Sequence, residues 1–338
     1  MQLVAYGAQD VYLTGNPQIT FFQIVYRRHT NFSIEAIKQD FEGTADFGSR
    51  SIVHVSRNGD LLSRIYLEHD ATFTRKTHGT FDEIGHVEHY GHSLIKECDI
   101  LHYHGQAVSH GYRDLVMWSG IMGKPVILHH HGSEIRNKDY PKFANDLVKY
   151  RYVSTPDLLE FVPNAEWLPN PVDIQGLEYS EPDVSGPLKI LHAPTNRDVK
   201  NTKAVETAIS ALKDEGLDIQ FTIAEDKKHS ELIEIISGND LVVDWLNPEY
   251  GIYGVFSIES MALGRTVICS LNDSLYDKHD VPIISIPPTD LADKIKELYN
   301  NRNLLVIGGK SSYDFVQSHH NPIESAKKVI ERYKAVLD

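Results

Sequence analysis

The 338-residue chain has few cysteines, no long apolar run and fewer basic than acidic residues. Its two cysteines, Cys98 and Cys269, exclude a scaffold built on disulfides. No apolar run approaches the roughly 18–20 residues needed to cross a bilayer, and the first ten residues lack the features of a secretory signal. A net charge of −14 argues against a general nucleic-acid binder. We therefore expect a cytoplasmic protein with no transmembrane segment and no nucleic-acid partner.

The pattern of apolar residues changes along the chain. Residues 1–70 contain short β-rich runs separated by Gly, Asn and Pro turns. Further on, strand-like runs alternate with helical ones, which predicts an α/β fold with parallel sheets. The predicted strands are Asp99–Tyr103, Pro125–Leu128, Arg151–Ser154, Leu188–His192, Asp218–Ala224, Leu241–Trp245 and Thr266–Ser270. The predicted helices are Thr202–Glu215, His229–Ser237 and Phe256–Leu263, followed by a helical tail after residue 288.

Histidines are concentrated in residues 69–131, which hold 11 of the 18 in the chain. His86, His89 and His92 recur every third residue, a spacing that places side chains on one face of a helix and permits a zinc site. No cysteine and few carboxylates complete such a site. The sequence therefore predicts a histidine-rich linker over residues 71–92, with no metal and no bound cofactor.

The first part of the chain carries a long run of family-specific sequence. The segments GAQDVYLTGNPQITFFQIVYRRHTNF (Gly7–Phe32), GTADFG (Gly43–Gly48) and SRNGDLLSRIYLE (Ser56–Glu68) resemble the start of the major capsid protein of nucleocytoplasmic large DNA viruses. That family folds as a double jelly roll, and a jelly roll needs eight strands. Residues 1–70 supply three or four. We therefore expect a capsid-like β segment that does not form a capsomer by itself and packs weakly on the rest of the chain.

The segment DLVVDWLNPEYGIYGVFSIESMALGRTVICS (Asp240–Ser270) is similar to the donor-binding region of GT-B glycosyltransferases of the family-4-like group. The resemblance implies a nucleotide-diphosphate site at the start of the helix that follows Tyr253. Free N–H groups at a helix N-terminus favour anions, which assigns donor binding to Gly254, Val255 and Phe256. The resemblance also implies that Glu259 binds the ribose hydroxyls. A solvated helix glutamate is the alternative.

Two further segments extend the same resemblance. Leu188–Ala193 is a buried-type strand followed by a loop with Arg197 and Lys200, which the resemblance places on the donor diphosphate. The segment PVILHHHGSEIR (Pro125–Arg136) resembles a late strand of the N-terminal GT-B domain, and His131 matches a position that faces the donor sugar. An ordinary basic loop and an ordinary strand-end histidine remain the alternatives. LPNPVD (Leu168–Asp173) resembles the crossing between the two domains.

The sequence departs from the GT-B pattern at two places. Many family-4 enzymes have a second glutamate eight residues before the first, and here that position is Gly251, with Glu249 the nearest acid. The N-terminal domain is also short, and Ser51–Ser56 is a candidate edge strand for its missing part. We predict two Rossmann-like units, the first truncated, over 93–175 and 187–338, preceded by the capsid-like segment 1–70.

These expectations define the function hypotheses. The first is a hexosyltransferase that moves a sugar from a nucleotide-diphosphate donor to an unknown glycan, lipid or protein, retaining configuration without a metal. Its catalytic residues are His131 and Glu259. The alternatives are a structural virion protein, or a capsid fusion carrying an inactive nucleotide-binding passenger.

Overall fold

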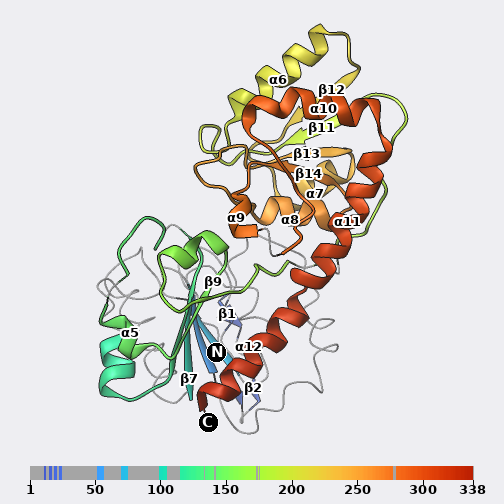
Figure 1. Cartoon of the computed structure of the whole chain (residues 1–338). Coiled ribbons are helices and arrows are strands. Elements are labelled where there is room, and N and C mark those ends of the chain that lie inside the picture. The colour runs from blue at the N-terminus through green and yellow to red at the C-terminus, as the bar shows by residue number, and fades with distance from the viewer. Residues whose placement is uncertain are drawn as a thin grey trace. The chain divides into compact units, whose positions relative to one another are not determined.

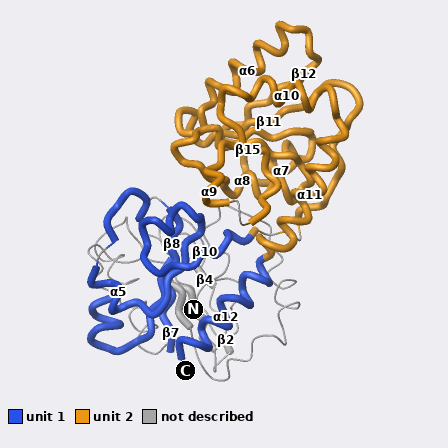
Figure 2. Tube along the Cα trace, in the orientation of Figure 1, with its two compact units in different colours: residues 1–171, 322–338 blue, residues 172–321 orange. Residues whose placement is uncertain are grey.

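The computed structural model divides the chain into two compact units, residues 1–171 with 322–338 and residues 172–321 (Figure 2). We call them unit 1 and unit 2 and describe each by itself. The described residues are 99–104, 115–132, 134–140, 142–172, 174, 176–276 and 279–337, with the backbone of six short strands before residue 75. Four of these strands form antiparallel pairs: β1 (Val11–Tyr12) with β4 (Gln23–Ile24), and β2 (Gly15–Asn16) with β3 (Ile19–Thr20).

Unit 1 is built on a six-stranded parallel sheet in the order β10-β9-β8-β7-β5-β6. Its strands are β5 (Ile52–Ser56), β6 (Asp70–Thr74), β7 (Ile100–His104), β8 (Val126–His130), β9 (Tyr150–Val153) and β10 (Glu166–Trp167). Every residue of β7 and β8 is buried, as expected for central strands of a parallel sheet. Strand β5 pairs with both β6 and β7, so the proposed substitute strand lies inside the sheet and not at its edge.

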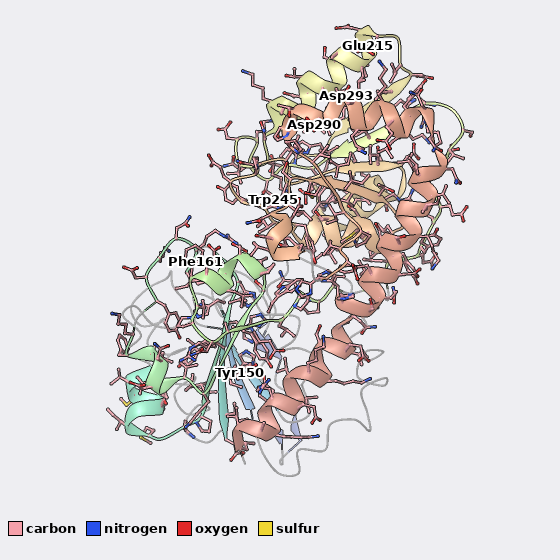
Figure 3. All side chains as sticks on the ribbon, viewed as in Figure 1. Tyr150, Phe161, Glu215, Trp245, Asp290 and Asp293 are labelled. Atoms are coloured by element: carbon pink, nitrogen blue, oxygen red, sulfur yellow. The ribbon has the colours of Figure 1, made fainter. Side chains whose placement is uncertain are left out.

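Helix α12 (Pro322–Leu337) runs beside the sheet of unit 1 (Figure 1). Its apolar stripe packs into a core with residues of β7, β8 and β9; the core members are Ile100, Ile127, Tyr152, Leu168, Ala326, Val329, Ile330 and Tyr333. The Arg332 guanidinium lies 3.8 Å from the centre of the Tyr150 ring, which Figure 3 labels. Helix α12 was predicted as the tail of the C-terminal domain 187–338. Its buried face packs on the sheet of unit 1, so the helix belongs to that unit. The shorter elements are η3 (Val116–Ile121), α5 (Ala144–Leu147) and η4 (Pro156–Glu160).

Unit 2 is built on a five-stranded parallel sheet in the order β12-β11-β13-β14-β15. Its strands are β11 (Leu188–His192), β12 (Ile219–Ile223), β13 (Leu241–Val243), β14 (Thr266–Cys269) and β15 (Ile284–Ser285). Its helices are α6 (Thr202–Asp214), α7 (His229–Ser237), α8 (Val255–Ala262), α9 (Asp273–Tyr276), η5 (Pro288–Asp290), α10 (Leu291–Asn300) and α11 (Asn303–His319). Strands and helices alternate along the chain, as the colour gradient of Figure 1 shows. The apolar faces of α6 and α10 join the sheet in one core.

The α/β prediction is confirmed in both units. The four strands predicted between residues 188 and 270 are present and parallel, and the three helices predicted among them start within one residue of their expected positions. The weak packing predicted for residues 1–70 and the histidine spacing at 86–92 lie outside the described residues. Among the helices that the structure describes, none combines the length and the apolar character needed to cross a bilayer.

Candidate functional site

Three loops of unit 2 open at one edge of its sheet. Strands β12, β11 and β13 are adjacent and parallel, so the segments that follow them emerge side by side. Ligands of open α/β sheets bind at this carboxyl edge. The loop after β11 carries Arg197 and Lys200, the segment after β12 carries Glu225, and Asp244 directly follows β13.

A buried ion pair links two of these loops. The Lys200 Nζ lies 2.5 Å from Asp244 Oδ1, and the side chains are 5% and 0% exposed. The same Nζ lies 5.4 Å from the centre of the Trp245 ring and 5.3 Å from that of Phe256. A buried pair holds its partners firmly, because removal of either leaves an uncompensated charge. The loop after β11 is therefore fixed beside the start of α8.

The N-terminus of α8 joins the same network. Ser257 in its first turn donates a hydrogen bond from Oγ to Asp244 Oδ2 at 2.5 Å. Gly254 is the N-cap residue and supplies no side-chain cap to the helix, so the first N–H groups of α8 are not satisfied by an N-cap side chain. Val255 is exposed and Phe256 is half-buried. The positive end of α8, which favours anions, thus lies beside the buried Lys200–Asp244 pair.

Two glycines explain the path of the chain into α8. A Cβ at Gly254 would lie 2.9 Å from Trp245 Nε1, so this position needs a residue without a side chain. Gly251 has a φ of +59°, and a Cβ there would lie 2.8 Å from Asn272 Cβ. Gly251 is the position at which the family-4 pattern has its other glutamate. Here the backbone conformation and the packing against Asn272 both disfavour a side chain.

Arg197 lies at the surface of the edge and is paired with carboxylates. Its Nε and Nη2 donate to the two carboxylate oxygens of Glu225, at 2.9 and 2.6 Å, and its Nη1 donates to Glu206 Oε1 at 3.2 Å. The hydrogen bonds from Arg197 lower the pKa of Glu225, and in turn raise that of Arg197. The side chain is 48% exposed, so solvent weakens these pairs and an anion can compete for the guanidinium.

Glu259 is not a solvated helix glutamate. Its Oε1 lies 2.7 Å from Nε2 of His229, the first residue of α7, and its side chain is 12% exposed. His229 therefore orients Glu259 from the neighbouring helix. A carboxylate held by one oxygen in this way is positioned to accept hydrogen bonds from a hydroxyl-rich ligand.

The predicted residue of unit 1, His131, follows β8 directly. Its backbone N–H donates to Glu134 Oε1 at 2.5 Å, and its Nε2 lies 3.4 Å from His104 Nδ1. Its ring stacks on that of His129, with 4.3 Å between the centres. The adjacent His130 points to the other face of β8, where burial lowers its pKa to about 4.

The structure brings together Lys200, Gly254 and Phe256, whereas Arg197 and Glu259 contact other partners. Sequence reasoning missed the residues that hold three of the predicted side chains, namely Asp244 for Lys200, Glu225 for Arg197 and His229 for Glu259. Asp244 could have been found from the sequence, because it is an acidic residue directly after the apolar run Leu241–Val243, within the segment Asp240–Ser270 that resembles a donor-binding region. Glu225 and His229 are separated from their partners by 28 and 30 positions, and no local pattern connects them.

The N-terminal part of the chain is similar to viral capsid proteins. A family model described as the major capsid protein N-terminus matches residues 20–125. The major capsid protein of Pyramimonas orientalis virus is 51% identical over 120 residues, which are 35% of this chain and 28% of that protein. Capsid protein 1 of Acanthamoeba polyphaga mimivirus is 39% identical over 161 residues, 46% of this chain and 25% of that protein. The chain thus spans about a quarter of the length of these relatives.

The fold of the chain is similar to that of solved GT-B glycosyltransferases. Anabaena HepE, in complex with UDP-glucose, superposes with a TM-score of 0.60 at 12% identity over 84% of this chain and 99% of that one. A sucrose-phosphate synthase from Thermosynechococcus elongatus gives a TM-score of 0.57 at 14% identity over 85% of this chain and 99% of that one.

The two similarities overlap in the chain. The capsid match runs past residue 70 and includes β5, β6 and β7 of the α/β sheet. Identities below 15% support the fold of the solved structures and not their activity. The chain therefore combines a capsid-protein-like N-terminus with a GT-B-like α/β fold.

Proposed function

We propose that unit 2 binds a nucleotide-diphosphate sugar and that the chain transfers the sugar to an acceptor. The observation that carries this proposal is the Lys200–Asp244–Ser257 network, which holds a basic loop beside the positive end of α8 at the carboxyl edge of the sheet. On a protein of net charge −14, such a local arrangement favours an anionic ligand.

Each residue of the site has its own role in binding the donor. Arg197 releases Glu225 and binds the diphosphate instead. The backbone N–H groups of Val255 and Phe256 donate hydrogen bonds to the diphosphate, which can come close because Gly254 has no side chain. Lys200, paired with Asp244, holds the loop that carries Arg197 beside the first turn of α8. Glu259, oriented by His229, accepts hydrogen bonds from the ribose. These groups meet the diphosphate charge without a divalent metal.

The sugar transfer depends on stabilisation of the departing nucleotide diphosphate. The bond between the anomeric carbon and the β-phosphate oxygen breaks, the electron pair leaves with the diphosphate, and Arg197 with the helix N-terminus stabilises that charge. The acceptor hydroxyl forms the new bond on the same face of the sugar, which retains configuration, and gives its proton to the departing phosphate oxygen. The sequence resemblance assigns His131, which follows β8 in unit 1, a role in the transfer step. Replacement of His131 by Ala is expected to abolish transfer while leaving nucleotide binding by unit 2 unchanged.

Ligand-induced thermal stabilisation tests the binding step. UDP and UDP-glucose are the first ligands to try, because the HepE structure contains UDP-glucose. A ligand at 100 times its Kd stabilises the native state by about 2.7 kcal/mol. We expect stabilisation by one nucleoside diphosphate and weaker stabilisation by its monophosphate, and we expect chelation of divalent metals to leave the size of each ligand-induced shift unchanged. No shift with the diphosphates of uridine, guanosine or adenosine would contradict the proposal.

A second candidate function rests on the capsid similarity. The 51% identity to a major capsid protein over 120 residues favours association with a virion, with the GT-B-like part carried as a passenger. Co-expression with a full-length capsid protein distinguishes the two. A passenger would co-sediment with assembled particles and would transfer no sugar, whereas a transferase would transfer sugar as a separate small species.

A further inference from the structure

Four histidines share one face of the sheet in unit 1. His102 and His104 lie two residues apart on β7, and His129 pairs with His104 in register on β8. Side chains that alternate along a strand and match across it project to the same face. His131 follows two residues after His129. Two neighbouring strands thus present imidazoles where a parallel sheet ordinarily presents apolar side chains.

Three of these imidazoles converge on one point. One ring nitrogen from each of His102, His104 and His129 lies within 4.8 Å of the other two. The three residues are 0%, 3% and 1% exposed. The ring centres of His102 and His104 are 4.4 Å apart, and those of His104 and His129 are 5.5 Å apart. The three nitrogens are therefore close enough to one another to ligate a single ion.

Two of the rings are held through the nitrogen that a metal would not use. His102 Nδ1 lies 2.5 Å from the hydroxyl of Tyr333, a fully buried residue of α12. His104 Nδ1 lies 3.4 Å from His131 Nε2. Metal-binding histidines are characteristically oriented in this manner, with one nitrogen hydrogen-bonded and the other on the metal. For His102 and His104 the binding atom is then Nε2.

We propose that His102, His104 and His129 form a binding site for a divalent first-row transition metal such as zinc. Imidazole suits zinc, copper, iron and nickel, whereas magnesium and calcium require oxygen ligands. Three histidines leave the fourth tetrahedral position for water. The ion joins β7 to β8 beneath α12. The site lies entirely in unit 1, so it is independent of nucleotide binding by unit 2.

Metal titration of the full chain tests the site. The chain is stripped with a chelator and titrated with Zn²⁺ and, for its spectrum, Co²⁺. We expect a tight Zn²⁺ site that His129→Gln removes, and a Tyr333→Phe variant that binds about tenfold more weakly, the usual scale for loss of an orienting partner. His192→Gln is the matched control, because it alters a buried histidine of unit 2 and is expected to retain the ion.

If His129→Gln does not fold, a second variant that gains a spectroscopic band still tests the site. Cysteine is itself a zinc and cobalt ligand, so the Co²⁺ form of His129→Cys is expected to show a thiolate-to-cobalt charge-transfer band that the wild-type Co²⁺ form lacks. The proposal is overturned if the stripped wild-type chain binds no Zn²⁺. It is also overturned if His129→Gln binds as tightly as the wild type, which would assign the ion to other histidines, or if His129→Cys gives no new band.

Discussion

The two parallel sheets end in different chemistry. In unit 1 the carboxyl ends of β7 and β8 carry imidazoles packed against one another, with Tyr333 of α12 on one of them. In unit 2 the carboxyl ends of β11 and β13 carry opposite charges in a buried pair, with a helix N-terminus beside them. Two sheets of the same architecture therefore carry a cluster of histidine nitrogens in unit 1 and an arrangement that favours anion binding in unit 2. The comparison shows that function is to be sought in the side chains at this edge of each sheet and not in the fold.

The largest effect is expected from breaking the buried pair of unit 2. Asp244→Asn leaves the charge of Lys200 buried without its carboxylate, which costs about 3–5 kcal/mol of unfolding free energy. Glu166→Gln is the matched change in unit 1, where the Arg332–Glu166 pair is 36% and 46% exposed; we expect about 1 kcal/mol or less there. Urea unfolding measures both. Equal losses at the two sites would contradict the contrast between a buried and a partly solvated pair.

A smaller loss is expected at the turn before α8. Gly251→Ala places a Cβ against Asn272 at a φ of +59° and is expected to cost about 1–3 kcal/mol. Gly216→Ala is the control, since Gly216 also has a positive φ, of +88°, but has open space around it. Thermal unfolding of the two variants separates the packing cost from the backbone cost. A Gly251→Ala variant no less stable than Gly216→Ala would refute the explanation for the missing glutamate.

The smallest effect concerns the competition for Arg197. Glu225→Gln removes the carboxylate that holds the guanidinium, and we expect UDP to bind about two- to fivefold more tightly, since exposed ion pairs contribute about 0.2–1 kcal/mol. Glu215→Gln is the control, because Glu215, labelled in Figure 3, forms an exposed pair with Lys296. Calorimetric titration with UDP measures both. A loss of affinity in Glu225→Gln would show that Glu225 assists the ligand and does not compete with it.

Sequence reasoning predicted local elements well and long-range partners poorly. The strand Leu188–His192 and the helix His229–Ser237 were predicted with the bounds that the structure has, because apolar periodicity and turn residues are local signals. The apolar spacing of Ala326, Val329, Ile330 and Tyr333 predicted a helix but not the sheet that it covers.

The candidate site was predictable to a similar extent. Lys200 was predicted as a basic loop residue beside a donor site, yet its burial depends on Asp244, 44 positions away. The convergence of His102, His104 and His129 depends on the register of β7 and β8. Neither periodicity nor spacing contains that register, and the predicted absence of a metal was based on other histidines.

The central claim is that the carboxyl edge of unit 2 binds a diphosphate through Arg197, and the most direct measurement compares UDP with UMP on two proteins. Calorimetric titration of the wild-type chain is expected to show tighter binding of UDP than of UMP. Arg197→Ala is expected to weaken UDP binding by about 1.5–3 kcal/mol, a factor of about 10–150, and UMP binding by much less. Lys310→Ala, a charge removal on the exposed face of α11, is expected to change neither. Unchanged UDP affinity in Arg197→Ala, or equal losses for UDP and UMP, would contradict the claim.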